Sequence, residues 1–234
     1  MSVSVVFLHG FAATGRHWDR VVDALPAGRF TPIPLNVTDA DPLSAEGVTR
    51  LVRESTEDPF VLVGYSMGGR LALHTALRIP ERVIRLVLIS TGAGIEDDGE
   101  RAARAAADEA LAAEIERSSI ASFIERWRAA PLFARDPDWV HAEVAVDERR
   151  STPAQLAASL RALGPGAIAP MWARLHELSM PVAVLAGEED AVYVDLGRRL
   201  ASAISDARFQ CVPGAGHRVA LQAPSAVVGA IEAR

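Results

Sequence analysis

Short apolar runs alternate along the chain with longer stretches in which apolar residues recur at helical spacing. Apolar runs of about four to eight residues, bounded by turn residues, are typical of strands that are covered on both faces. They predict strands at Val3–Leu8, Phe60–Gly64, Val83–Ile89, Val182–Ala186 and, more weakly, Arg208–Val212. Helices are predicted between them, notably at Gly69–Arg78 and Val194–Ile204. This order indicates an α/β fold with a mainly parallel sheet and helices on both faces.

One long segment breaks the alternation. Residues 92–179 contain no convincing strand, and the part from Glu96 to Arg128 is rich in Ala, Glu and Arg with helical spacing. We interpret this segment as a helical lid inserted into an α/β core that comprises residues 1–91 and 180–234. A separate helical domain is the alternative, and it is less favoured because the strand pattern resumes directly afterwards.

Composition narrows the classes of protein and of partner. The chain has 234 residues, of which 50% are hydrophobic, so it can bury a large core. Its net charge of -6 argues against binding to nucleic acid or to an anionic membrane. The single cysteine, Cys211, excludes an internal disulfide and fits a reducing cytoplasm. The N-terminal residues predict neither a signal peptide nor a transmembrane helix, and no Cys/His cluster has metal-binding spacing.

The strongest chemical signal is a Gly-x-Ser-x-Gly motif. It runs from Gly64 to Gly68, directly after a predicted strand and directly before a predicted helix. Its two glycines permit a sharp turn that exposes the hydroxyl of Ser66 above the edge of the sheet. The following helix directs its N-terminus to the same place, where it favours developing negative charge. The motif therefore predicts a nucleophile elbow, which indicates the α/β-hydrolase fold.

A base and an orienting acid follow in the order that this fold requires. Asp190 comes at the end of one predicted strand, and His217 follows the last predicted strand. We expect His217 to accept the proton of Ser66 and Asp190 to orient the imidazole. Glu188 and Glu189 compete for the role of the acid, although we interpret them as a solvated acidic turn.

Two backbone amides are candidates for an oxyanion hole. In this fold one N–H comes from the residue after the nucleophile and one from the loop after the first strand. These positions correspond to Met67 and Phe11. His9 lies at the end of that first strand, where we favour a structural role over that of a catalytic base.

With these motifs in place, the chain resembles the α/β-hydrolase superfamily over nearly its whole length. More narrowly, it is similar to the 2-succinyl-6-hydroxy-2,4-cyclohexadiene-1-carboxylate synthases of the menaquinone pathway. The stretches that carry the narrower resemblance are Leu8–Phe11, Gly64–Arg70, Arg101–Arg104 with Phe123–Trp127 and Pro131–Phe133, and Leu156–Leu160 leading to Gly164.

The resemblance implies a lyase that needs no cofactor. In such an enzyme the serine of the triad acts as a base, and pyruvate is eliminated from a small substrate that carries several carboxylates. Arginines hold those carboxylates, since a guanidinium binds a carboxylate with two hydrogen bonds. The residues that match the substrate-binding positions are Tyr65, Arg70, Arg104 and Trp127, with a third arginine at either Arg149 or Arg150.

Other interpretations stay open. The chain contains no lysine, so an arginine also reflects composition, and Arg101 and Arg104 could simply pair with Glu100 and Asp108 on a solvated helix face. The segment 33–41 lacks the Asp-x-x-Gly-His-Gly-like turn of the family, which puts the identity of the substrate in doubt. The same triad would serve a serine hydrolase acting on an ester, thioester or carbon–carbon bond. A non-catalytic binding protein is less favoured, and both a monomer and a homo-oligomer are compatible with the sequence.

Overall fold

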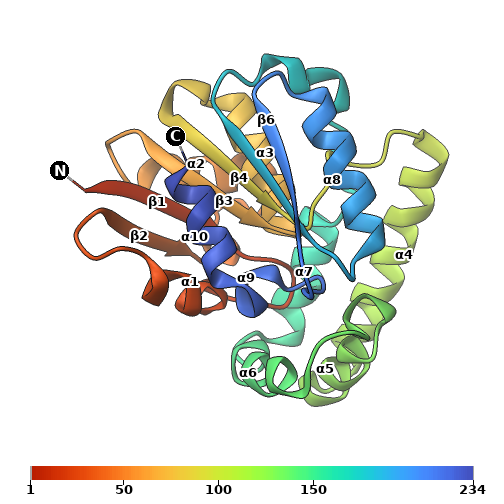
Figure 1. Cartoon of the computed structure of the whole chain (residues 1–234). Coiled ribbons are helices and arrows are strands. Elements are labelled where there is room, and N and C mark those ends of the chain that lie inside the picture. The colour runs from red at the N-terminus through yellow and green to blue at the C-terminus, as the bar shows by residue number, and fades with distance from the viewer. Residues whose placement is uncertain (1, 234) are drawn as a thin grey trace.

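A sheet of six parallel strands organises the computed structural model, which describes residues 2–233 (Figure 1). The strands lie in the order β2-β1-β3-β4-β5-β6. Their bounds are β1 (Val3–Leu8), β2 (Phe30–Leu35), β3 (Phe60–Tyr65), β4 (Val83–Ile89), β5 (Val182–Gly187) and β6 (Ala207–Val212). The five strands predicted from the apolar runs are confirmed to within one residue at either end. The α/β-hydrolase fold and its mainly parallel sheet are therefore confirmed.

Strand β2 was not predicted, because it contains Pro32 and Pro34. Proline cannot donate a hydrogen bond to a neighbouring strand, so it is restricted to the edge of a sheet. β2 is an edge strand and pairs only with β1, with Pro32 opposite Val5 and Pro34 opposite Phe7. Because the two prolines are two residues apart, their nitrogens face the same side of the strand, which is the free edge.

Alternating side chains of the strands form two apolar cores, one on each face of the sheet. Val6, Leu8 and Leu62 pack with α2 (Ala45–Glu54), α3 (Met67–Arg78) and α8 (Ala191–Ala203). Val5, Phe7 and Val61 pack on the other face with α1 (Asp19–Ala24), α9 (Val219–Gln222) and α10 (Pro224–Glu232). Strands that are buried on both faces have few polar positions, which explains the nearly continuous apolar runs in the sequence.

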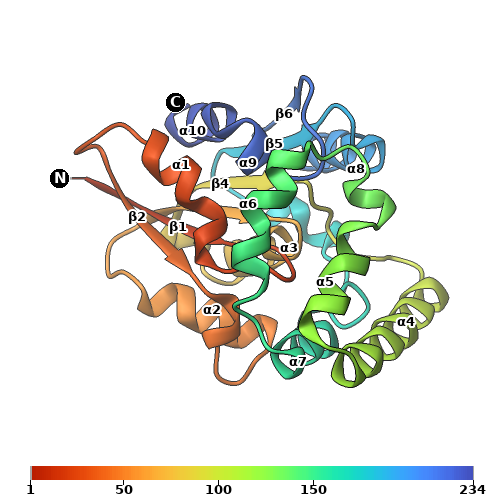
Figure 2. The same cartoon turned by 90° about the horizontal axis from the view of Figure 1, so that it is seen from below.

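Four helices lie between β4 and β5, although these two strands are direct neighbours in the sheet. They are α4 (Asp98–Arg117), α5 (Ile120–Arg128), α6 (Asp138–Glu148) and α7 (Pro153–Leu163). Seen from below, they lie across the end of the sheet at which the strands terminate (Figure 2). Helix α4 buries Asp108, Ala112 and Ile115, a spacing that places all three on one side of the helix.

The inserted helices have an apolar cluster of their own, which includes Phe123, Leu156 and Leu160. The last part of the predicted insertion behaves differently, because Met171, Leu175 and Leu178 belong to the core on the sheet. The helices that form the layer over the sheet therefore end at Leu163, ahead of the boundary expected at residue 179. Whether this layer is a separate lid domain stays a prediction.

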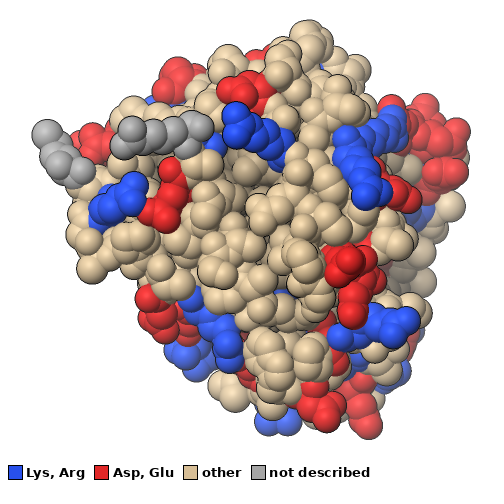
Figure 3. Space-filling view, viewed as in Figure 1, with Lys and Arg blue, Asp and Glu red and all other residues tan. Residues whose placement is uncertain are grey.

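Acidic and basic side chains lie next to one another around the periphery of the face shown in Figure 3, and its centre is uncharged. Many of the arginines form ion pairs at the surface, such as Arg161 with Glu109 and Arg199 with Glu96. Within residues 2–233, no helix is long and apolar enough to cross a membrane.

Candidate active site

Ser66 occupies a sharp turn between β3 and α3. Its backbone has φ 53° and ψ -113°, a combination that ordinary residues rarely adopt. The turn is possible because two glycines leave room around it. A Cβ on Gly64 would lie 2.4 Å from the carbonyl oxygen of Gly68, and a Cβ on Gly68 would lie 2.1 Å from that of Leu8. The nucleophile elbow expected from the motif is therefore present in the backbone.

Three side chains that are far apart in the sequence form a chain of hydrogen bonds at this turn. The Ser66 hydroxyl lies 3.1 Å from Nε2 of His217, and Nδ1 of His217 lies 2.6 Å from Oδ2 of Asp190. With the proton on Nδ1, the imidazole donates to Asp190 and can accept the proton of Ser66. Ser90 donates to the carbonyl of His217 at 2.9 Å. It thereby holds the backbone of residues 213–218, which connect β6 to α9 and which we call the histidine loop.

The two competing carboxylates do not contact His217. Oε2 of Glu188 accepts a hydrogen bond from the amide of Gly214 at 2.9 Å, which stabilises the turn before the histidine. Glu189 is exposed. Asp190 is therefore the carboxylate whose position suits the orienting role.

The candidate oxyanion hole lies beside the serine. Phe11 and Met67 both line the cavity that contains Ser66. Met67 is the first residue of α3, where a backbone amide has no partner within the helix. Both residues therefore border the space beside Ser66, and the role of their amides as an oxyanion hole stays a prediction.

His9 holds the loop after β1 rather than facing the cavity. Its Nδ1 donates to the carbonyl of Gly10 at 2.7 Å, and its Nε2 accepts from the amide of Val37 at 3.1 Å. Burial lowers the pKa of His9, so that the neutral imidazole needed for both bonds is favoured. Val37 lies in the segment that replaces the family's Gly-His turn, and this bond connects that segment to the candidate oxyanion loop.

The free space above Ser66 is about 100 Å³, which is smaller than the usual pocket for a drug-sized ligand. Core residues form its floor and inserted helices its roof. Its lining is Phe11, Tyr65, Ser66, Met67, Arg70, Arg104, Trp127, Leu132, Phe133, Leu160, Gly164, Pro165, Tyr193 and His217. Eight of the ten site residues expected from the sequence are among them, the exceptions being Asp190 and Arg149, and no acidic side chain lines the cavity.

Arg70 and Arg104 enter this cavity from different sides. Arg70 comes from α3 and is buried, and its Nε has no hydrogen-bond partner among the described residues. Burial lowers the pKa of the Arg70 guanidinium, because its charged form loses hydration there. Arg104 comes from α4 and donates from Nε to Asp108 at 2.8 Å, so the expected ion pair and a place in the cavity are both observed.

The expected third arginine is not at the site. Arg149 is exposed and borders a separate surface hollow with Arg128 and His141. Arg150 is exposed as well. The reason is helical geometry: α6 ends at Glu148, which is buried, and the next residue points about 100° away around the helix axis.

Aromatic side chains form the rest of the wall. Trp127 contacts Phe11 and Phe133, with ring centroids 5.2 and 5.4 Å apart. Tyr65 is buried and stacks on His17 at 4.6 Å. Burial raises the pKa of the Tyr65 phenol, so it is neutral in the folded protein.

Tyr193 is a cavity residue that sequence reasoning missed. Its ring centroid lies 4.7 Å from that of His217. Burial raises the pKa of the Tyr193 phenol, although the charges of Arg70 and Arg104 act in the opposite direction. The signal in the sequence was its distance of three residues from Asp190 at the start of a helix, which puts both on one side of that helix. Among the described residues, no group of three or more His, Cys, Asp or Glu side chains is arranged to hold a metal ion.

Comparison with known proteins agrees with this geometry. Residues 5–230 match the model of the alpha/beta hydrolase family. The chain is 34% identical to a putative 2-succinyl-6-hydroxy-2,4-cyclohexadiene-1-carboxylate synthase of Bacillus subtilis, over 95% of this chain and 86% of that one. The synthase of Klebsiella pneumoniae strain MGH 78578 is 29% identical, over 97% and 91%.

Solved structures share the fold. MenH from S. aureus superimposes with a TM-score of 0.90 at 24% identity, covering 98% of this chain and 93% of that one. A thermophilic esterase from Thermogutta terrifontis gives 0.83 at 23%, covering 99% and 88%. The family match and the Bacillus relative together show that the chain belongs to the alpha/beta hydrolase family and, within it, to the 2-succinyl-6-hydroxy-2,4-cyclohexadiene-1-carboxylate synthases.

Proposed function

We propose that this enzyme is a lyase that removes a proton from a cyclohexene polycarboxylate and eliminates pyruvate from its enolpyruvyl side chain. This is the reaction type of the family, and it takes place in the menaquinone pathway. The base is a side chain of the protein, so the reaction requires no cofactor. A cytoplasmic location stays a prediction.

The observation that carries the proposal is the state of Arg70. The Nε of this buried side chain has no hydrogen-bond partner among the described residues, which is costly, and a carboxylate that binds beside it reduces that cost. Arg104 lies on the same cavity, and no acidic side chain lines it. A site with these properties favours an anionic small molecule over a neutral ester.

The geometry of the triad supplies the base. The Ser66 hydroxyl gives its proton to Nε2 of His217, and Asp190 stabilises the imidazolium through Nδ1. The serine oxygen then takes the proton from the substrate carbon. The electron pair of the broken C–H bond forms a new ring double bond and expels the enolpyruvate oxygen. The expelled enolpyruvate oxygen takes the proton that Nε2 of His217 holds, which restores the neutral imidazole, and the enol tautomerises to pyruvate.

The surroundings of Ser66 favour the charged transition state. We assign to the amides of Phe11 and Met67, together with the N-terminus of α3, the stabilisation of negative charge that develops on the substrate. Trp127 and Phe133 supply an apolar wall that excludes water and strengthens these electrostatic interactions.

The test is to supply the enolpyruvyl cyclohexene substrate and to follow pyruvate with lactate dehydrogenase and NADH. A neutral aryl ester is assayed in parallel. Pyruvate release that depends on Ser66 supports the lyase. Brisk ester hydrolysis without any pyruvate release contradicts it and supports the serine hydrolase, which uses the same triad.

A further inference from the structure

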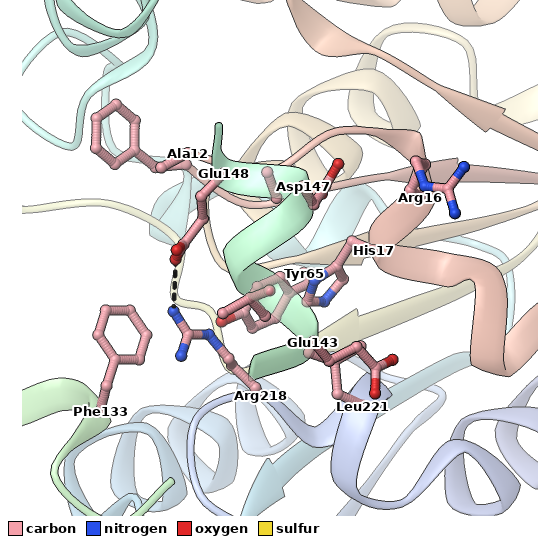
Figure 4. Close-up of a pocket in the computed structure, with 13 residues that line it drawn as sticks. Ala12, Arg16, His17, Tyr65, Phe133, Glu143, Asp147, Glu148, Arg218 and Leu221 are labelled. Atoms are coloured by element: carbon pink, nitrogen blue, oxygen red, sulfur yellow. Dashed lines mark hydrogen bonds and ion pairs between the residues drawn. The ribbon is translucent and has the colours of Figure 1, made fainter. Parts of the chain in front are cut away.

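A buried cluster of charged side chains lies beside the catalytic histidine. Arg218 directly follows His217, and its Nη1 donates to Oδ2 of Asp136 at 2.5 Å. Its Nη2 lies 3.3 Å from Oε1 of Glu148. The side chains of these three charged residues are at most 5% exposed, so nearly all of their hydration is lost. Figure 4 shows Arg218 pointing to Glu148 across a second pocket, which lies beside Tyr65.

The cluster joins the inserted helices to the histidine loop. Glu148 is the last residue of α6, and Arg128 is the last residue of α5. Oε2 of Glu148 accepts a hydrogen bond from Nε of Arg128 at 2.7 Å. Asp136 lies in the connection between these helices. We call Arg128, Asp136, Glu148 and Arg218 the Arg218 cluster. Its two positive and two negative groups balance one another.

A second connection reaches the other side of the histidine. The amide of Gly216 donates to Oε1 of Gln222 at 2.8 Å, and Nε2 of Gln222 donates to Oδ1 of Asp136 at 2.8 Å. The residues immediately before and after His217 are therefore both connected to Asp136. A displacement of Asp136 would change the hydrogen bonding on both sides of the histidine.

Phe133 completes the contact. It follows α5 in the insertion, and the Arg218 guanidinium lies 3.9 Å from the centroid of its ring. The same ring lies 6.0 Å from that of His217 and borders the cavity at Ser66. One aromatic side chain of the inserted segment thus touches both Arg218 and the catalytic histidine.

Stability alone does not account for such a cluster. Burying ions costs hydration, and well-packed apolar residues of similar size often replace a buried ion pair without loss of stability. The cluster does provide directional bonds between the inserted helices and the loop that carries His217, the two parts of the chain that both border the cavity above Ser66. Burial raises the pKa of Glu148, and its two arginine partners, Arg128 and Arg218, act in the opposite direction by favouring the carboxylate.

We propose that Arg218 is a positioning residue, which docks the α5–α6 part of the insertion on the histidine loop so that His217 is correctly placed only when these helices are docked. The inference does not depend on the substrate, because elimination and ester hydrolysis both use His217. Its test can therefore fail while the proposed function stands, and the reverse is equally possible.

The experiment compares the parent enzyme with Arg218→Met, Glu148→Gln and the double variant. Arg20→Met is the matched control, because Arg20 also pairs with an acid of α6, Glu143, and within residues 2–233 it forms no hydrogen bond or ion pair with the loop that carries His217. Two quantities are measured on folded protein. One is the rate at which diisopropyl fluorophosphate labels Ser66, and the other is amide hydrogen exchange in residues 120–150 relative to β3 and β4.

We expect Arg218→Met to lower the labelling rate about ten- to a hundredfold, the loss that small displacements of catalytic groups cause. Exchange in residues 120–150 rises while exchange in the sheet does not. Glu148→Gln gives a smaller change in the same direction, and the losses in the double variant are less than additive because both changes affect one contact. Arg20→Met leaves both quantities at the parent values.

A lower melting temperature with unchanged labelling and exchange would show a merely structural role and overturn the proposal. Equal effects of Arg218→Met and Arg20→Met would overturn it as well. If Arg218→Met does not fold, Glu148→Gln decides: it preserves the shape of the side chain, and parent-like labelling and exchange in that variant would contradict the inference.

Discussion

Ser66 and Arg70 line the same cavity because they lie one turn apart at the start of α3, where the Arg70 amide donates to the Ser66 carbonyl at 3.2 Å. A ligand that reaches the serine hydroxyl therefore also lies close to a guanidinium. This relationship combines the hydrolase triad with a preference for anions, and it motivates the predictions below.

Replacing Ser66 by Ala should lower turnover by several orders of magnitude, because the triad then has no oxygen to remove the substrate proton. The fold should persist, since the loss of one hydroxyl removes only a bond to His217. Pyruvate release and circular dichroism are the measurements. A purified variant that keeps near-parent turnover would exclude the serine-centred mechanism.

Asp190→Asn should cost far more activity than the same change at either neighbouring glutamate. Of the three carboxylates, Asp190 alone contacts His217, and the amide of an asparagine cannot stabilise an imidazolium in the same way. Glu188→Gln should reduce stability slightly, because Glu188 caps the Gly214 amide, and Glu189→Gln is the control at an exposed position. Equal losses of kcat/KM in all three variants would contradict the assignment of Asp190 as the orienting acid.

Arg70→Gln and Arg104→Gln should each lower kcat/KM for the anionic substrate. A lost charge-assisted contact costs about 1.5–3 kcal/mol, which is about ten- to a hundredfold in rate. Turnover of a neutral aryl ester should change little. Arg149→Gln is the matched control, because that residue is exposed and borders a different hollow. A large effect of Arg149→Gln together with a small one of Arg70→Gln would contradict the assignment.

His17 should make stability depend on pH. Burial, reinforced by the nearby positive charge of Arg218, lowers the pKa of His17 from its ordinary value of 6.5 to about 3. Between these two values the unfolded chain binds a proton that the folded protein does not bind, so the free energy of unfolding falls as pH falls. The slope that His17 contributes is about 1.4 kcal/mol per pH unit.

This contribution can be isolated with His17→Phe, which retains an aromatic ring against Tyr65. Urea denaturation at several pH values below 6.5 should show the variant gaining on the parent by that slope. The exposed His176, changed to Gln, is the control. Parallel curves for parent and His17→Phe would mean that His17 takes up a proton in the folded state.

The sequence predicted the sheet well wherever strands are buried on both faces. Such strands leave a nearly continuous apolar run. The turn at the end of β3 is marked in addition by Gly64 and Gly68, where a Cβ would clash with backbone atoms. Strand β2 was not predicted because it contains Pro32 and Pro34, and proline is rare in strands that have neighbours on both sides. Only the three-dimensional structure shows that this strand lies at an edge.

The site was harder to predict on the side of the inserted helices. The resemblance identified Arg104 and Trp127, but it placed the third arginine at Arg149 or Arg150. The residue that faces inward at this point is the one before them, Glu148. The pairing of Glu148 with Arg218 joins residues 70 positions apart. No local pattern reports such a contact, because it depends on how the insertion lies on the core.

The direct pairing of β4 with β5 has a consequence for how enzymes of this architecture diversify. Leu86 lies opposite Val182 and Ile89 opposite Leu185, so the chain leaves the sheet at the end of β4 and returns to it at the start of the parallel strand beside it. A segment attached in this way can change in length or be exchanged as one piece without altering the register of any strand. Transplanting residues 92–167 from a relative should therefore transfer the roof of the pocket. The base keeps its place only if the graft retains Asp136 and Glu148, the partners of Arg218, so substrate preference is separable from reactivity in this scaffold as long as that contact is preserved.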